Sequence, residues 1–222
     1  MQTVEYAPGR LADVFGEPSQ PTVLLWHGMQ SDARSAVRTL AGLVAARGPA
    51  VVAPDWDAQA DDNGRDDLLR SARFAAQRAG HEALVVVGWS MGGLAAAGLT
   101  INASRLDTAL RHTVCLAGAF TATDPISGAV PARALSGVEP RSPLLLLHGA
   151  ADVVVPDSAS RDFAAELKRH GWQAEFVGID ADHASIAGAD YDPVAGRYSA
   201  SEDPETLAVA TDVAARIAAC LD

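Results

Sequence analysis

The sequence predicts an α/β fold in which helices cover one doubly wound, mostly parallel β-sheet. Three observations lead to this prediction. Short and almost continuous apolar runs recur along the chain, helical periods of apolar residues separate them, and polar residues follow directly after several of the runs. Short apolar runs are typical of parallel strands that are buried on both faces. Their alternation with helices favours a doubly wound sheet.

The strands are predicted from the apolar runs in chain order. They cover residues 23–25, 50–53, 83–87, 113–117 and 144–147. A further strand over residues 174–179 alternates more in polarity, which is typical of a strand at the edge of a sheet. Before Pro21, the dipeptide Pro8-Gly9 has the composition of a tight turn and predicts an N-terminal hairpin.

The helices are predicted from apolar residues that recur every three or four positions. The first two stripes comprise Val37, Leu40, Ala41 and Val44, and then Leu68, Ala72, Ala75 and Ala79 before Gly80. The last stripe comprises Leu207, Ala210, Thr211, Ala214, Ile217, Ala218 and Leu221. A helix with such a stripe covers one face of the sheet with its apolar side.

Length and composition fit one domain that spans residues 1–222. A chain of 222 residues with 49% hydrophobic residues is long enough for one substantial core and too short for two comfortable domains. Residues 1–10 lack the basic and apolar pattern of a secretory signal, and no apolar stretch approaches the length that spans a membrane. We therefore expect a cytoplasmic protein without a membrane partner.

The formal net charge of −11 narrows the class of partner. Nucleic acids and anionic membrane surfaces are disfavoured, because phosphate binding needs clustered Lys and Arg. Neutral or cationic small molecules are easier to accommodate. The chain contains no phosphate loop, dinucleotide fingerprint or cluster of metal ligands, so we expect no metal and no other cofactor. Composition predicts nothing about the oligomeric state.

The pentapeptide Gly88-Trp89-Ser90-Met91-Gly92 is the most informative motif of the chain. It follows the predicted strand over residues 83–87 and precedes a helix-like stretch of small residues. A G-x-S-x-G motif between a strand and a helix places its serine at a strained corner, with the hydroxyl exposed above the sheet. Ser90 is therefore a candidate nucleophile.

Other polar residues follow the predicted strands at the same edge of the sheet. In such a sheet the ligand site lies beyond the carboxyl ends of the strands. The segments at those ends are 26–29 (Trp-His-Gly-Met), 55–56 (Asp-Trp), 118–120 (Gly-Ala-Phe), 148–152 (His-Gly-Ala-Ala-Asp) and 180–183, which ends in histidine. These segments contain more polar and ionisable side chains than the packing of the strand ends requires.

Together these motifs resemble the α/β-hydrolase family from about residue 20 to the end of the chain. The nucleophile motif, His27-Gly28 after an early strand, Asp152 and His183 occur in the chain order of that family, in which serine precedes the acid and the acid precedes histidine. The resemblance implies an α/β-hydrolase fold and a catalytic triad. The size also resembles dienelactone-hydrolase-like proteins, from which Ser90 departs because they typically use cysteine.

The resemblance implies that His183 is the base that takes the proton of Ser90. It is the histidine that follows both the last strand and a plausible acid. The other histidines have plainer interpretations at strand or helix ends: His27, His81, His112, His148 and His170. Asp152 corresponds to the family's acid, which orients the imidazole. Asp124 is the alternative acid, and its Asp-Pro sequence also fits a simple turn.

The resemblance also implies an oxyanion hole. Its donors are the backbone N–H of Met91, which follows the nucleophile, and that of Met29, which follows His27-Gly28. Gln30 is next in line for the second role. Such donors act on the charge that develops on the carbonyl oxygen in the transition state.

Substrate access is predicted from two segments. Residues 119–141 are short and interrupted by proline and glycine, so they cannot build a helical lid, and we expect a minimal lid over an open entrance. The loop over residues 184–204 either covers part of the mouth or is a polar surface connection, and its composition favours the connection. Trp56, Phe120 and Val153 are predicted to shape the substrate pocket. Trp89 is expected to pack beneath the nucleophile.

These features predict a serine hydrolase that cleaves small carboxylic esters through an acyl-enzyme. A thioesterase, a lactonase or an acyltransferase would use the same triad, and these alternatives stay open. A binding or signalling protein with little turnover is the alternative from another class, because a fold does not fix function.

Overall fold

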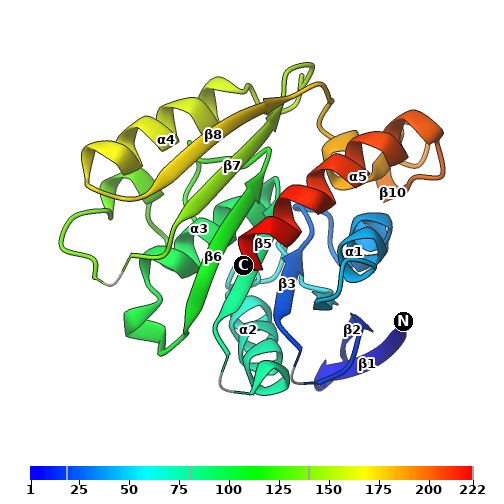
Figure 1. The fold of residues 1–222 in the computed structure, drawn as a ribbon, viewed down its shortest axis with the longest axis horizontal. Coiled ribbons are helices and arrows are strands. Elements are labelled where there is room, and N and C mark those ends of the chain that lie inside the picture. Colours follow the sequence, from blue (N-terminus) through cyan, green and yellow to red (C-terminus); the bar gives the residue numbers. More distant parts are fainter. Residues whose placement is uncertain (19, 81, 140, 222) are drawn as a thin grey trace.

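The computed structural model describes residues 1–18, 20–80, 82–139 and 141–221. An eight-stranded sheet crosses the molecule in the order β1-β2-β4-β3-β5-β6-β7-β8 (Figure 1). The strands are β1 (Gln2–Ala7), β2 (Arg10–Phe15), β3 (Thr22–Trp26), β4 (Ala50–Pro54), β5 (Leu84–Trp89), β6 (Leu110–Leu116), β7 (Leu144–Gly149) and β8 (Ala174–Ile179). All neighbours from β4 to β8 run parallel, whereas β1 and β2 pair antiparallel at one edge. The predicted mostly parallel sheet is confirmed.

The predicted strands match the structure with small differences at their ends. The N-terminal hairpin turns at Pro8-Gly9, where Gly9 has a φ of 74°. Strand β8 lies at the edge of the sheet, as its alternating polarity predicted. Strands β3 and β4 are buried along their whole length, because helices cover both of their faces.

The helices divide between the two faces of the sheet. The α-helices of the described residues are α1 (Arg38–Ala45), α2 (Arg65–Ala79), α3 (Met91–Ile101), α4 (Ser158–Arg169) and α5 (Pro204–Ala218). One core contains Leu68 of α2, Leu94 of α3 and Phe163 of α4, whereas the other contains Leu40 of α1 and Val213 of α5. Helices α1 and α5 lie side by side on that second face (Figure 1).

Alternate residues of the central strands enter the two cores. Val23 and Leu25 of β3 belong to the core under α1 and α5, whereas Leu24 and Trp26 belong to the core under α2, α3 and α4. This follows from the two-residue period of a strand. The parallel strands therefore end together at one edge, where the segments with candidate catalytic residues emerge.

Short elements complete the chain. The 3₁₀ turns cover Arg34–Val37, Ser104–Leu106, Pro131–Arg133, Ser185–Ala187 and Ala219–Leu221, and a second sheet pairs β9 (Ala189–Asp192) with β10 (Arg197–Ala200). Within the described part of residues 119–141, Pro131–Arg133 is the only helical element, as expected for a minimal lid. None of the described helices is long and apolar enough to cross a membrane.

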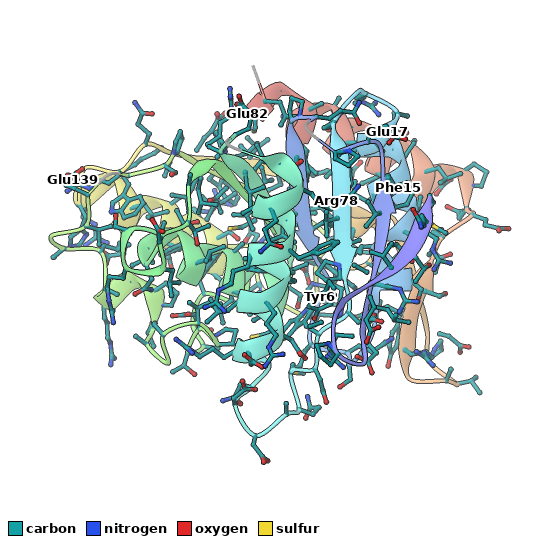
Figure 2. All side chains as sticks on the ribbon, turned by 90° about the horizontal axis from the view of Figure 1, so that it is seen from below. Tyr6, Phe15, Glu17, Arg78, Glu82 and Glu139 are labelled. Carbon is teal, nitrogen blue, oxygen red and sulfur yellow. The ribbon has the colours of Figure 1, made fainter. Side chains whose placement is uncertain are left out.

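The N-terminal hairpin is fastened to the rest of the fold by polar contacts. Tyr6 reaches from β1 towards α2 (Figure 2), where its ring centroid lies 6.3 Å from that of Phe74 and its hydroxyl donates to the Asp55 carbonyl oxygen at 2.7 Å. The fully buried Asp13 carboxylate of β2 accepts hydrogen bonds from Arg34 Nε at 3.2 Å and from Arg38 Nη2 at 2.8 Å. The hairpin thereby holds the segment that leads from Met29 into α1.

We expect Asp13→Asn to lower the free energy of unfolding by about 3 kcal/mol, because two guanidinium groups then lose their shared buried charge partner. Urea unfolding measures this. The matched control is Asp66→Asn, which removes the exposed pair between Asp66 and Arg70 on α2 and should cost much less. Equal losses in the two variants would contradict the role of Asp13.

Candidate active site

Ser90 lies at the turn between β5 and α3 in a strained backbone conformation, with φ 57° and ψ −117°. Side chains other than glycine rarely adopt this region, so the surrounding structure must hold it. The Ser90 N–H donates to the Leu116 carbonyl oxygen of β6 at 2.8 Å, and the Ser90 carbonyl oxygen accepts from the Gly93 and Leu94 amides at 3.0 and 3.1 Å. These bonds on both sides fix the corner that the motif predicted.

The two glycines of the motif allow backbones to approach more closely than any side chain permits. A Cβ atom on Gly88 would lie 2.0 Å from the Gly92 carbonyl oxygen, and one on Gly92 would lie 2.3 Å from the His27 carbonyl oxygen. Helix α3 therefore begins directly against β5 and against the segment after β3. This brings Ser90 next to the predicted oxyanion loop.

The predicted oxyanion loop, residues 27–30 after β3, lies against the candidate nucleophile. A Cβ atom on Gly28 would be only 3.4 Å from Ser90 Cβ. Met91 is the first residue of α3, so its N–H has no acceptor within the helix. Within the described residues the Met29 amide makes no hydrogen bond either. Two free N–H groups beside Ser90, one at a helix N-terminus, suit a developing negative charge.

His183 and Asp152 form a close pair. His183 Nδ1 lies 2.7 Å from Asp152 Oδ2, and the Asp152 side chain is fully buried. Asp152 Oδ1 accepts from the Val154 and Val155 amides at 2.8 and 2.9 Å, which fixes the carboxylate plane. Because a carboxylate only accepts, His183 holds its proton on Nδ1, and Nε2 is left free to accept one.

Gly149 brings the acid and base segments together. A Cβ atom on it would lie 2.3 Å from the Ala181 carbonyl oxygen. The Ala150 amide donates to the Ile179 carbonyl oxygen at 2.8 Å, and the Ala151 amide donates to that of Ala181 at 3.0 Å. The turn after β7 and the loop after β8 are thus joined backbone to backbone, so Asp152 and His183 meet although 31 positions separate them.

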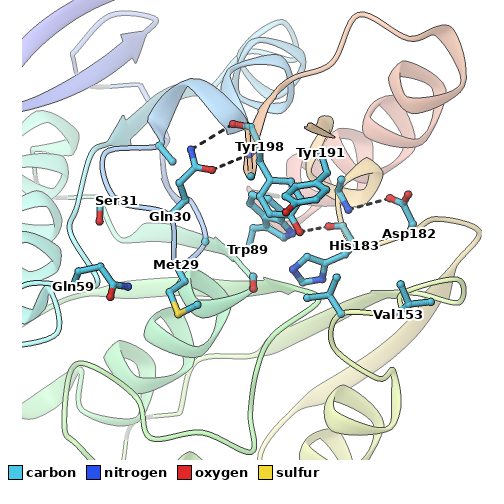
Figure 3. Close-up of a pocket in the computed structure, with 16 residues that line it drawn as sticks. Met29, Gln30, Ser31, Gln59, Trp89, Val153, Asp182, His183, Tyr191 and Tyr198 are labelled. Carbon is cyan, nitrogen blue, oxygen red and sulfur yellow. Dashed lines mark hydrogen bonds between the residues drawn. The ribbon is translucent and has the colours of Figure 1, made fainter. Parts of the chain in front are cut away.

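The segments that carry Ser90, Met29 and His183 border one cavity of about 800 Å³ (Figure 3). Ser90 and His183 both line it, together with Met29 and the exposed Val153, one of the residues proposed for the substrate pocket. Among its described lining residues there is no Lys or Arg, and Asp182 is the only carboxylate. A smaller cavity of about 340 Å³ also borders Met29 and is lined by Met91.

The model of the "Alpha/beta hydrolase family" matches residues 23–220 of the chain. The chain belongs to this family. None of the curated proteins compared with this hydrolase matches its sequence.

Solved structures with the same fold include two esterases. Esterase 2 from the planctomycete Thermogutta terrifontis with bound propionate is 17% identical, with a TM-score of 0.70 over 97% of this chain and 94% of that one. The esterase from Pyrobaculum calidifontis is 18% identical, with a TM-score of 0.67 over 95% of this chain and 80% of that one. The expected α/β-hydrolase fold is therefore confirmed.

Two predicted pocket residues of the hydrolase lie elsewhere. Trp56 is fully buried, stacks on His27 with ring centroids 5.5 Å apart and donates from Nε1 to the His27 carbonyl oxygen at 3.2 Å. Phe120 is buried and stacks on Phe163 of α4 with ring centroids 4.3 Å apart. Both predictions were wrong, because these aromatic rings turn into the core instead of towards the cavity.

The interpretation of residues 184–204 as a polar surface connection was also wrong. Strands β9 and β10 form a hairpin, and Tyr191 and Tyr198 on one face of it line the cavity (Figure 3). Gln30 of the oxyanion loop binds the hairpin backbone, accepting from the Tyr198 amide at 2.8 Å. A turn composition at Asp192-Pro193 and Gly196, between two tyrosines, was the signal for this hairpin.

Asp124, the alternative acid, stabilises a turn with its side chain. It is buried, and its Oδ1 accepts from the Ile126 and Ser127 amides at 2.8 Å each. The Asp182 carboxylate accepts from the Ala184 and Ser185 amides at 2.9 and 2.7 Å. The structure therefore brings Asp152, and neither of these, to His183 Nδ1. His81 lies outside the described residues.

Trp89 has a contact that the sequence did not predict. It is almost fully buried, as expected, and its Nε1 donates to the His183 carbonyl oxygen at 2.8 Å. Its ring meets that of Tyr198 edge-on, with centroids 4.9 Å apart. The residue before the candidate nucleophile thus holds the backbone of the candidate base.

His27 is a buried support for the oxyanion loop. Its Nδ1 donates to the Gly28 carbonyl oxygen at 2.8 Å, and Nε2 accepts from the Ala33 and Trp56 amides at 3.2 Å each. Because Nε2 accepts from two N–H groups, the ring must be neutral. Burial lowers the pKa of His27 to about 3.

We expect this hydrolase to lose stability as the pH falls from about 6.5 towards 3. In this window the unfolded chain binds a proton at His27 that the folded chain does not, since the folded pKa lies below the ordinary value of 6.5. His27→Gln should be less stable at neutral pH and should show a shallower acid decline. His112, whose pKa burial also lowers, accounts for part of the remaining slope. Urea unfolding at several pH values measures both effects, and an unchanged slope in His27→Gln would contradict the assignment.

Proposed function

We propose that this α/β hydrolase is a serine carboxylesterase that cleaves small, neutral carboxylic esters. We also propose that residues 1–222 form a single catalytic domain. One observation carries the proposal. The buried pair between His183 Nδ1 and Asp152 Oδ2, at 2.7 Å, opens onto the same cavity as the strained Ser90. A nucleophile, a base and an orienting acid in this relation are the parts that acyl transfer requires.

In the proposed reaction, Ser90 Oγ attacks the ester carbonyl carbon while His183 Nε2 takes the hydroxyl proton. The Met29 and Met91 N–H groups stabilise the oxyanion that forms. His183 then gives its proton to the leaving alcohol oxygen as the carbon–oxygen bond breaks. Water attacks the acyl-enzyme, passes a proton to His183, and releases the carboxylic acid, after which the proton returns to Ser90.

The structural neighbours support an ester substrate with a short acyl group. Esterase 2 of Thermogutta terrifontis has been solved with propionate and with butyrate, and also after phosphorylation by paraoxon. Propionate and butyrate are short carboxylates of the kind that hydrolysis of such an ester releases. The cavity of about 800 Å³ holds a molecule of this size together with its alcohol portion.

The electrostatics of the cavity support a neutral ester. With no Lys or Arg among its described lining residues and with Asp182 at its wall, the cavity offers a substrate carboxylate no Lys or Arg as a cationic partner. The formal net charge of −11 adds a negative electrostatic potential, which also disfavours an anionic substrate.

A fluorophosphonate probe should label wild-type protein at Ser90, and His183→Ala should reduce the labelling rate by at least about a thousandfold, because Ser90 then lacks its base. Peptide mass spectrometry locates the label. Ser90→Ala should not react, and His170→Ala, a change at the half-buried histidine after α4, should react as wild type does. No labelling of folded wild type would contradict the mechanism.

The same variants separate the alternatives. Asp152→Asn should lose turnover far more than Asp124→Asn if Asp152 is the acid, whereas the reverse would reassign it. Rates on matched oxyesters, thioesters and lactones, with added alcohols as acyl acceptors, distinguish an esterase from a thioesterase, lactonase or acyltransferase. Stoichiometric acylation without turnover would indicate a binding protein instead.

We expect kcat/KM for para-nitrophenyl butyrate to exceed that for the para-nitrophenyl hemiester of succinate by at least about tenfold, because the terminal carboxylate must enter a cavity whose described lining residues include no Lys or Arg. Raising the salt concentration should narrow the difference by screening the repulsive part. Stopped assays at constant pH measure both. Equal values at low salt would contradict the charge argument.

A further inference from the structure

Exposed apolar side chains gather at the mouth of the main cavity. Seven large apolar side chains of the described residues are exposed, and four of them line this cavity: Met29, Val153, Val154 and Tyr191. Exposed apolar side chains that gather in one place mark a binding surface. The reaction as proposed above assigns no part of the substrate to them.

Two of these four residues are placed beside His183 by the turn that carries the proposed acid. Val153 and Val154 directly follow Asp152, whose Oδ2 lies 2.7 Å from His183 Nδ1. In Figure 3, Val153 accordingly lies on the His183 side of the cavity, and Met29 lies on the other side. The exposed apolar surface therefore continues the side of the cavity from which His183 acts.

A row of aromatic rings lies on the same side. The distance between ring centroids is 5.5 Å from His183 to Trp89, 4.9 Å from Trp89 to Tyr198 and 4.8 Å from Tyr198 to Tyr191. Trp89 is almost fully buried, Tyr198 is partly buried and Tyr191 is half exposed. Tyr191 therefore ends the row at the mouth. Aromatic rings attract one another at such separations, so a further ring can pack against Tyr191.

The chemistry of ester cleavage determines which part of the substrate meets this side. His183 must give its proton to the leaving alcohol oxygen as the carbon–oxygen bond breaks, so this oxygen lies at His183 Nε2. The carbonyl oxygen points instead to the predicted oxyanion hole at the Met29 and Met91 amides. The alcohol portion therefore extends from Ser90 towards the His183 side.

We propose that Tyr191, Val153 and Val154 form the subsite for the alcohol portion of the substrate, and that Tyr191 is its specificity-determining residue. The subsite takes an aromatic alcohol of benzylic size. This inference rests on the proposed function and names its substrate class, the esters of a short carboxylic acid with an aromatic alcohol. Such an alcohol covers the exposed apolar surface and extends the row of rings.

A lipid surface is the other occupant that exposed apolar side chains suit. The strand that carries Tyr191 also exposes Asp190 and Asp192, and Asp182 lines the cavity. Carboxylates at these positions repel an anionic lipid surface, and the described lining residues include no Lys or Arg to offset them. The charges therefore favour a small, uncharged alcohol portion over a membrane.

The test uses two isomeric esters, benzyl acetate and methyl phenylacetate, which carry the same aromatic group on the alcohol side and on the acyl side. We expect Tyr191→Ala to lower kcat/KM for benzyl acetate about fivefold. The change should appear mainly in KM, because the lost contact is present in the bound substrate as well as in the transition state. The value for methyl phenylacetate should change by less than about twofold. Tyr191→Phe, which keeps the ring, should behave as wild type does with both esters, and chromatography of the released products measures all four rates.

Val194→Ala is the matched control. Val194 is almost fully exposed in the turn of the same hairpin, but it is not among the lining residues of the cavity. This variant should therefore keep the wild-type values for both esters. Equal losses in Val194→Ala and Tyr191→Ala would indicate a general effect on the hairpin and overturn the inference.

Other results would also overturn it. A loss in Tyr191→Ala that is as large or larger with methyl phenylacetate would place the acyl portion against Tyr191. Unchanged values for both esters would leave Tyr191 without a role in specificity. Hydrolysis of tributyrin only above its solubility limit would assign the exposed apolar residues to a lipid surface.

The labelling of Ser90 distinguishes the two levels of inference. Wild type that neither labels nor turns over para-nitrophenyl butyrate contradicts the proposed function. Wild type that does both, with an unaffected Tyr191→Ala, contradicts only the subsite for the alcohol portion.

Discussion

The site depends on backbone segments that approach one another too closely for a Cβ atom at the carboxyl edge of the sheet. Gly88 and Gly92 let α3 start against β5, and Gly149 lets the turn after β7 touch the loop after β8. The first approach sets Ser90 beside the oxyanion loop, and the second sets Asp152 beside His183. Because these contacts are between backbones, the relative positions of the candidate catalytic residues follow largely from the packing of the backbone around the sheet.

Two buried histidines at this edge of the sheet, His27 and His148, have opposite hydrogen-bond patterns. His27 holds the oxyanion loop by accepting two amides on Nε2, so its ring is neutral and its low pKa follows from burial. His148 has the opposite arrangement, because its Nε2 donates to the Val155 carbonyl oxygen and its Nδ1 faces Ser160 Oγ. Both lie at the carboxyl end of a buried strand and precede glycine, yet the partners across the fold give them opposite tautomers. Residue type and position in the strand therefore do not by themselves determine the role.

The sequence predicts features that depend on local patterns, but not those that depend on contacts between distant parts of the chain. The strands, the hairpin at Pro8-Gly9 and the nucleophile corner follow from local patterns, and the pairing of Asp152 with His183 was anticipated from the order of motifs in the family. Trp56 and Phe120 were misplaced because an aromatic residue after a strand can turn to either side, and only the packing of α4 and of His27 decides which. The bond from Trp89 to His183 joins positions 94 residues apart, which no local pattern reports.

The hairpin of β9 and β10 is joined to the predicted oxyanion loop by a hydrogen bond between the Gln30 side chain and the hairpin backbone. Gln30 binds the main-chain amide of Tyr198 and not its side chain. This bond therefore does not depend on which side chains the hairpin carries, whereas the surface that the hairpin presents to the cavity depends on Tyr191 and Tyr198. Tyr198 also packs against Trp89, whereas Tyr191 is half exposed. A chain of this fold can therefore change the residue at the position of Tyr191, and with it the wall of the cavity, while the hairpin keeps its bond to Gln30.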